Sequence, residues 1–75
     1  MAKYLNDNIK YLRTKKGISQ QTLADKVGID RSTISRIETN EIETTIDNAL
    51  KIADYFNVSI KDLTTKDLTK ENLID

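Results

Sequence analysis

Apolar side chains recur at helical spacing along most of this sequence. In the first such stretch Leu5, Ile9 and Leu12 are spaced i, i+4 and i+7, which predicts a helix over residues 5–16. Gly17 follows directly, and glycine is the residue that most often ends a helix because it tolerates a left-handed backbone. The chain therefore opens with an amphipathic helix and a defined stop.

The stretch over residues 20–39 predicts two helices joined by a tight turn. Ala24 is small enough for the point where two steeply crossing helices approach each other. Gly28 suits a chain reversal that needs a positive φ, and Ile29 is placed to fill the space beneath the turn.

The second of these helices has two different faces. Asp30 is expected to cap it, and Ile34 and Ile37 point toward the core. The face turned away from the core contains two arginines among short hydroxyl side chains and no acid. Its members are Arg31 (at the margin), Ser32, Ser35, Arg36 and Thr39. A helix that enters the DNA major groove needs small residues for close approach and Arg for guanine edges or phosphates, so we predict a base-reading face. A plain solvated face is the alternative.

Two further helices are predicted in the second half. Thr45 caps the fourth, Asn57 closes it, and the pattern Ser59-x-x-Asp62 begins a fifth. The broad apolar stripe of the fourth helix is interpreted as core and not as a cofactor site. The fold class predicted is all-α with five helices. The residues expected to be buried are Leu12, Leu23, Ala24, Val27, Ile34, Ile37, Leu50, Ala53 and Phe56.

The motif resembles the Cro/repressor-type helix-turn-helix of lambdoid phage repressors, also called the xenobiotic-response-element family, through ISQQTLADKVGIDRSTISRIETN. The similarity runs from about Ile9 to Leu63. NIKYLRTKKGIS looks like the first helix of the family, and TTIDNALKIADYFNVSIKDL looks like its fourth helix and the start of its fifth. The resemblance implies a compact five-helix lambda-repressor-like DNA-binding domain over residues 1–63, followed by a C-terminal tail over 64–75. That tail is expected to be a short sixth helix on a partner, a frayed end or a linker.

The resemblance also implies roles for individual residues. Gln20 and the amides beside it would hold a DNA phosphate, and Thr33 and Asn40 would help to position the DNA backbone. Arg13 would pair with Glu38, a structural ion pair beside the core.

Relatives commonly form dimers through the fifth helix and the loop before it. The residues that would form this interface here are Tyr55, Val58, Ile60 and Leu63. They could equally serve to seal a monomer. In the loop after the recognition helix, Glu41 and Glu43 stand where better-studied phage relatives tend to carry Lys, Arg and Pro, which argues against loop contacts to phosphate.

Composition narrows the function further. The 75 residues include no Cys, Pro or His, so the usual general base and the Cys and His metal ligands are absent, and we expect no metal, no cofactor and no enzymatic activity. There is no signal-peptide run and no apolar stretch near the ~20 residues that cross a bilayer, so a cytoplasmic protein without membrane contact is expected.

The charge is balanced overall but unevenly distributed. Net charge is zero, yet eight basic and four acidic residues precede residue 40. This asymmetry fits a protein with one DNA-binding face. The function predicted is a sequence-specific transcriptional regulator, a repressor of phage, plasmid or restriction–modification type that binds inverted-repeat double-stranded DNA as a homodimer. The alternative is an antitoxin-type module that neutralises a partner protein, with which the acidic second half is compatible.

Overall fold

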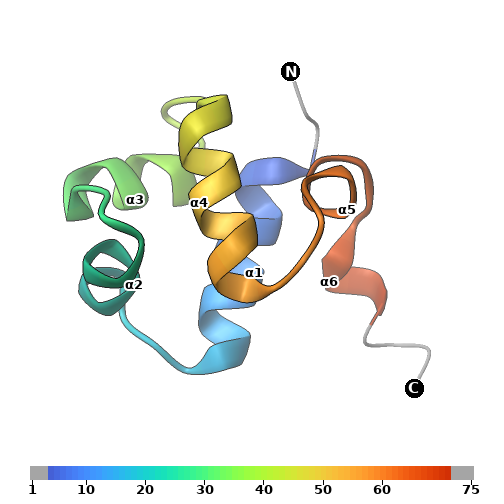
Figure 1. Cartoon of the computed structure of the whole chain (residues 1–75), viewed down its shortest axis with the longest axis horizontal. Coiled ribbons are helices and arrows are strands. Elements are labelled where there is room, and N and C mark those ends of the chain that lie inside the picture. The colour runs from blue at the N-terminus through green and yellow to red at the C-terminus, as the bar shows by residue number, and fades with distance from the viewer. Residues whose placement is uncertain (1–3, 72–75) are drawn as a thin grey trace.

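A computed structural model describes residues 4–71 of the chain, and over these residues it contains helices and no strand (Figure 1). The helices are α1 (Leu5–Lys16), α2 (Gln20–Val27), α3 (Arg31–Glu38), α4 (Ile46–Phe56), α5 (Ile60–Thr65) and α6 (Leu68–Glu71). The all-α prediction is confirmed. The described part of the chain has six helices where five were expected, because the tail contributes α6.

Hydroxyl side chains cap three of the helices at their N-termini. Each accepts a hydrogen bond from the backbone amide three residues later, as predicted for Thr45 and Ser59. The caps are Ser19 to Thr22 at 3.0 Å, Thr45 to Asn48 at 3.2 Å and Ser59 to Asp62 at 3.0 Å. The prediction for Asp30 was wrong in its chemistry: this residue precedes α3, but its carboxylate forms no capping hydrogen bond.

Left-handed residues follow four of the helices, and the sequence predicted Gly17, Gly28 and Asn57 for this role. Gly17 follows α1 with φ 75°, and Gly28 forms the turn between α2 and α3 with φ 71°. Asn57 after α4 has φ 56°, and Asn40 after α3 has φ 61°. Asparagine tolerates this conformation better than other residues with a Cβ, so the turns need no further glycine.

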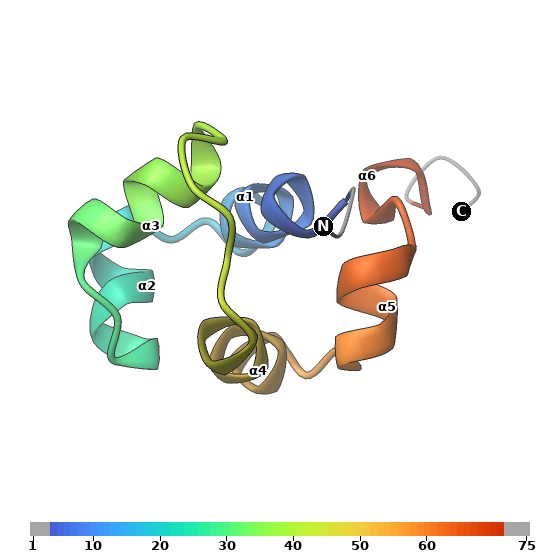
Figure 2. The same ribbon diagram turned by 90° about the horizontal axis from the view of Figure 1, so that it is seen from above.

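Seen from above, α1 lies between α3 and α6, with α4 on the opposite side of the core and α2 and α5 flanking it (Figure 2). One contiguous core joins all six helices. Its buried apolar members are Leu5, Ile9, Leu23, Ala24, Val27, Ile29, Ile34, Ile37, Ala49, Ile52, Ala53, Leu63 and Leu68. The position of Ile29 beneath the turn is as predicted.

Three residues expected in the core are not fully buried. Leu12 and Phe56 are partly buried and pack against the core from outside. Leu50 is 49% exposed, so its assignment to the core was wrong. The inward arc of α4 is filled by Ala49, Ile52 and Ala53, and Leu50 lies about 100° around the helix from Ala49. The apolar stripe of α4 is therefore wider than the surface it buries.

Asn8 joins the tail to α1. This fully buried side chain donates from Nδ2 to the carbonyl oxygens of Leu63 at 2.8 Å and Lys66 at 2.7 Å, and its Oδ1 accepts from the amide of Leu68 at 3.0 Å. The α6 helix thus packs on α1 of its own chain. The domain boundary expected after residue 63 falls inside α5.

The first turn of α1 also anchors the loop between α3 and α4. Asn6 donates from Nδ2 to the Ile42 carbonyl at 2.8 Å and accepts from the hydroxyl of buried Thr44 at 2.7 Å. Next to it, the Asp7 carboxylate accepts a 3.3 Å hydrogen bond from the side-chain nitrogen Nδ2 of Asn40. The acidic loop is therefore tied to α1. No helix in the described part of the chain is long and apolar enough to cross a membrane.

Candidate nucleic-acid interface

The α3 helix is fixed on its inner face and open on its outer face. Ile34 and Ile37 are fully buried, which holds the helix on the core. The side chains of Arg31, Ser32 and Arg36 are exposed, whereas Ser35 and Thr33 are partly buried. The predicted base-reading residues of α3 therefore do lie together along one side of a firmly packed helix.

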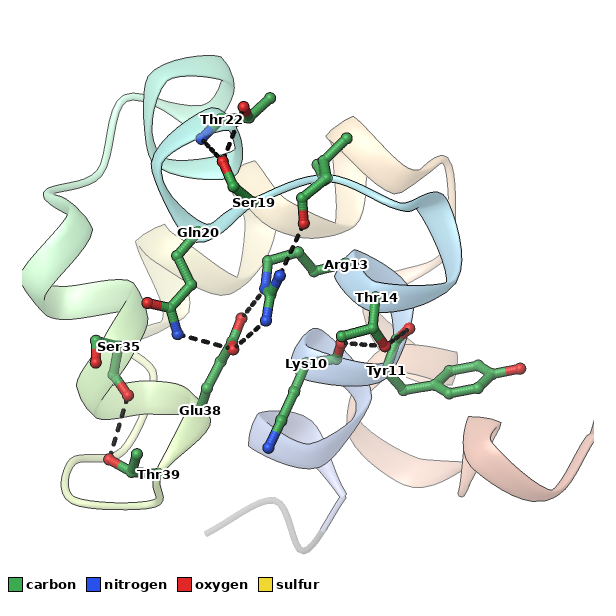
Figure 3. Close-up of polar contacts among 11 residues, drawn as sticks. Lys10, Tyr11, Arg13, Thr14, Ser19, Gln20, Thr22, Ser35, Glu38 and Thr39 are labelled. Carbon is green, nitrogen blue, oxygen red and sulfur yellow. Dashed lines mark hydrogen bonds and ion pairs between the residues drawn. The ribbon is translucent and has the colours of Figure 1, made fainter.

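Thr39 differs from the other predicted base readers. It lies just beyond the last residue of α3, and its hydroxyl is 2.6 Å from a carboxylate oxygen of Glu41 and 3.2 Å from the carbonyl oxygens of Ser35 and Arg36. Figure 3 shows Thr39 turned back toward Ser35. A hydroxyl has one proton, and the short contact assigns it to Glu41. Toward a ligand, Thr39 can then offer an acceptor and its methyl group only.

Glu41 lies at the C-terminal end of the same face. Its backbone amide donates to the carbonyl oxygen of Arg36 at 2.9 Å, which places the residue directly after the turn at Asn40. A carboxylate here is unfavourable both toward the negative end of the helix dipole and toward any phosphate. The sequence did not reveal that this acid contacts Thr39.

The predicted ion pair between Arg13 and Glu38 is present and connects α1 with α3 (Figure 3). Arg13 donates from Nε to Glu38 at 2.6 Å, from Nη2 to the other carboxylate oxygen at 2.9 Å, and from Nη1 to the carbonyl of Ile18 at 2.7 Å. The side chains are 14% and 2% exposed. A guanidinium in α1 thus satisfies a buried carboxylate in α3 and also orders the start of the loop before α2.

Gln20 is the third member of this network. Its Nε2 donates to Glu38 at 3.1 Å, a contact that sequence reasoning did not find because the two residues lie 18 positions apart. An amide nitrogen carries two protons, so one remains for another acceptor. The Gln20 side chain is held between the start of α2 and the end of α3, pointing toward Glu38 (Figure 3).

The network also sets the charge of the surface. The hydrogen bond and the charge of Glu38 raise the pKa of Arg13 above the usual arginine value, against the opposing effect of burial. Glu38 is satisfied internally. Over Arg31–Glu38 the exposed charges are therefore the guanidinium groups of Arg31 and Arg36, and the helix presents a positive face.

The N-terminus of α2 lies beside the C-terminal end of α3, where Gln20 contacts Glu38. The first backbone hydrogen bond of α2 runs from the Leu23 amide to the Ser19 carbonyl at 3.0 Å, and the Ser19 hydroxyl satisfies Thr22. The amides of Gln20 and Gln21 precede that first bond, so they point out of the helix end, where anions bind favourably.

The residues predicted for a dimer interface have different environments. Tyr55, Val58 and Ile60 are partly buried and pack on the core of their own chain. Leu63 is fully buried, so its assignment to the interface was wrong: a side chain with no accessible surface has nothing to offer a second chain. Tyr55 is further occupied by an edge-on contact with Phe56 at 5.1 Å between ring centroids.

Comparison with known proteins gives a consistent result. A family model described as Helix-turn-helix matches residues 9–63. An uncharacterised HTH-type transcriptional regulator of Methanocaldococcus jannaschii is 36% identical over 59 residues, covering 79% of this chain and 89% of the relative.

Two solved structures share the fold. The solution structure of the DNA-binding domain of the P22 c2 repressor superposes with a TM-score of 0.79 at 27% identity, covering 93% of this chain and 92% of that one. The crystal structure of the P22 c2 repressor with a synthetic operator gives a TM-score of 0.75 at 28% identity, covering 87% and 97%.

Proposed function

Because this chain belongs to the Cro/repressor-type helix-turn-helix family of DNA-binding transcription regulators, we propose that it is a repressor that reads a specific operator with α3. The observation that carries the proposal is the outer face of α3, where two exposed guanidinium groups lie among short side chains on a helix fixed from behind. The P22 c2 repressor, a similar protein, has been crystallised on operator DNA.

In this proposal α3 enters the major groove. Arg36, one turn into the helix, is the principal base reader, since a long side chain there can donate two hydrogen bonds to a guanine edge. Arg31, Ser32 and Ser35 contact neighbouring bases or phosphates. Thr39 contributes as an acceptor or through its methyl group, because its hydroxyl donates its hydrogen bond to Glu41.

Phosphate contacts position α3 in the groove. The amides of Gln20 and Gln21 and the second proton of the Gln20 amide group are donors at the end of α2, where a phosphate oxygen is favourable. Thr33 and Asn40 are further candidates for the backbone. Because Glu38 holds both Gln20 and Arg13, a phosphate bound at α2 would be fixed relative to the base-reading side chains of α3.

The operator we propose is an inverted repeat bound by a homodimer. A two-fold dimer would present two α3 helices to half-sites about one helical turn, ~34 Å, apart. We propose that the protein is a repressor of phage, plasmid or restriction–modification type.

The test has two steps. Selection of bound duplexes from a random pool should enrich one half-site sequence, which is then compared with a scrambled duplex for wild type and Arg36→Ala. We expect Arg36→Ala to weaken operator binding by ~1–3 kcal/mol and to relax preference at one base pair per half-site. The matched control is Lys61→Ala, which removes an exposed cation on α5. It should leave the ratio of operator affinity to scrambled-duplex affinity unchanged.

If Arg36→Ala leaves the ratio of operator affinity to scrambled-duplex affinity unchanged, Arg36 is not the base reader and Arg31 is the next candidate. If the pool yields no enriched sequence, while the chain co-purifies with a protein encoded next to it, the antitoxin-type alternative replaces the repressor.

A further inference from the structure

Apolar side chains are exposed at one end of α4. Ile46 is 61% exposed, Leu50 is 49% exposed, and Ile42, in the loop that leads into the same helix, is 38% exposed. These are the large apolar residues most open to solvent in the described part of the chain. We call Ile46 and Leu50 the α4 stripe, since they are one helical turn apart and project from the same side.

Charged residues follow one edge of the α4 stripe in a specific order. At 100° per residue, Asp54, Asp47 and Lys51 lie about 80–140° around the helix from Ile46, all on the same edge. All three are exposed. Asp47 and Lys51 are spaced i, i+4, yet neither forms an ion pair within residues 4–71.

This order of charges is self-complementary. When two copies of a helix pack antiparallel about a two-fold axis, each edge meets the same edge of the other copy in reverse order. With the axis level with residue 49, Asp47 of each copy lies opposite Lys51 of the other, which forms two equivalent ion pairs beside the apolar contact. Asp54 of each copy then lies level with residue 44 of the other copy, just before the start of its α4 at Ile46.

We propose that the α4 stripe is the surface through which two copies of this chain associate, by antiparallel packing of α4 on α4. The proposal rests on the proposed function, since it supplies the dimer that an inverted-repeat operator requires. A second copy fits better than another polypeptide: a basic partner would meet Lys51 and an acidic one would meet Asp47 and Asp54, whereas the two-fold arrangement pairs Asp47 with Lys51.

The surface also differs from the one that the sequence suggested. The corner between α4 and α5 uses its apolar side chains on its own core, with Leu63 fully buried. The α4 stripe has accessible apolar area to bury, although two or three side chains per copy give a small interface. We therefore expect a weak dimer that DNA completes.

The decisive experiment uses charge exchange. Sedimentation of the full chain between about 1 µM and 1 mM, without DNA, should show a concentration-dependent monomer–dimer equilibrium. Asp47→Lys and Lys51→Asp should each weaken self-association at least tenfold, because each places like charges opposite one another. An equimolar mixture of the two variants should recover association, since the lysines of one copy then face the aspartates of the other. Leu50→Glu should also weaken association at least tenfold.

Lys61→Asp, on α5 beside the alternative corner, is the control and should associate as wild type does. A wild-type chain that stays monomeric, both free at 1 mM and on DNA, overturns the proposal. So does a mixture of the charge variants that fails to associate, or a loss of association caused by Lys61→Asp alone. Binding to a single half-site, measured in parallel, depends on the proposed function only. If wild type fails to bind a single half-site, the proposed repressor function is refuted, and the sedimentation result is unaffected.

Discussion

Removing the Arg13 side chain should destabilise this fold more than any other exchange of a charged residue in α1–α3. Arg13→Ala deletes two hydrogen bonds to Glu38 and one to the carbonyl of Ile18. The carboxylate, 2% exposed, is then left with the single hydrogen bond from Gln20. Stranding a buried charge in this way costs about 3–5 kcal/mol.

That cost is large for so small a domain. At about 0.05–0.15 kcal/mol per residue, 75 residues give a free energy of unfolding of about 4–11 kcal/mol. Arg13→Ala should thus remove roughly half of it and lower Tm by more than about 12 °C, at about 4–8 °C for each kcal/mol. Solvent screening reduces the effect little, because both side chains are largely buried.

The assay is urea and thermal unfolding followed by circular dichroism, with a double-mutant cycle. Arg13→Met with Glu38→Leu removes both charges, and we expect it to be more stable than either single variant, since no unpaired charge remains. Lys26→Ala, an exposed cation on α2, should lie within about 0.5 kcal/mol of wild type. A cost below about 1 kcal/mol for Arg13→Ala, or additive effects in the double variant, would show that the pair is not a buried, mutually dependent unit.

Three further predictions follow from the other polar contacts. Asn8→Ala should lower the free energy of unfolding by about 2–4 kcal/mol and make the chain near Leu68 sensitive to limited proteolysis, because two carbonyls and one amide lose their partner. Asn8→Asp should not restore stability, since a carboxylate cannot donate to those carbonyls. Glu41→Lys should steepen the salt dependence of DNA affinity by about one unit of slope and raise binding to scrambled duplex, as measured in a salt series. Gln20→Ala should weaken operator and scrambled duplex by similar factors, and a selective loss on operator would show that Gln20 reads a base.

The helices were predictable because the signals for them are local. The bounds of α1, the hydroxyl caps and the left-handed stops depend on residues within one turn of each other, and the structure has them where the sequence placed them. The opposite faces of α3 followed from the 3.6-residue period alone. The pairing of Arg13 with Glu38 came from family resemblance and would not have followed from spacing.

What the sequence did not reveal depends on contacts between distant segments. The burial of Asn8 was not foreseen, since an asparagine is normally predicted to lie at the surface. Its three hydrogen-bond partners lie some 55 to 60 residues away in the sequence, and no local pattern indicates them. Leu50 was predicted in the core and is exposed, whereas Leu63 was predicted at an interface and is buried. Hydrophobicity indicates that a residue can be buried, but it does not indicate which neighbour covers it. The hydrogen bond from Thr39 to Glu41 was missed because side-chain rotamers after a helix end are not encoded in periodicity.

The first turn of α1 has a consequence for the order in which the molecule can form. Asn6 and Asp7 find their partners in the loop from residue 40 to 44, and Asn8 finds its partners from Leu63 to Leu68. During synthesis α1 emerges before the other helices, but the carbonyls that accept from Asn8 Nδ2 come only with Leu63 and Lys66, and the amide that donates to its Oδ1 comes with Leu68. The helix that is made first is therefore the last to complete its hydrogen bonds, and the contacts of greatest sequence separation form last.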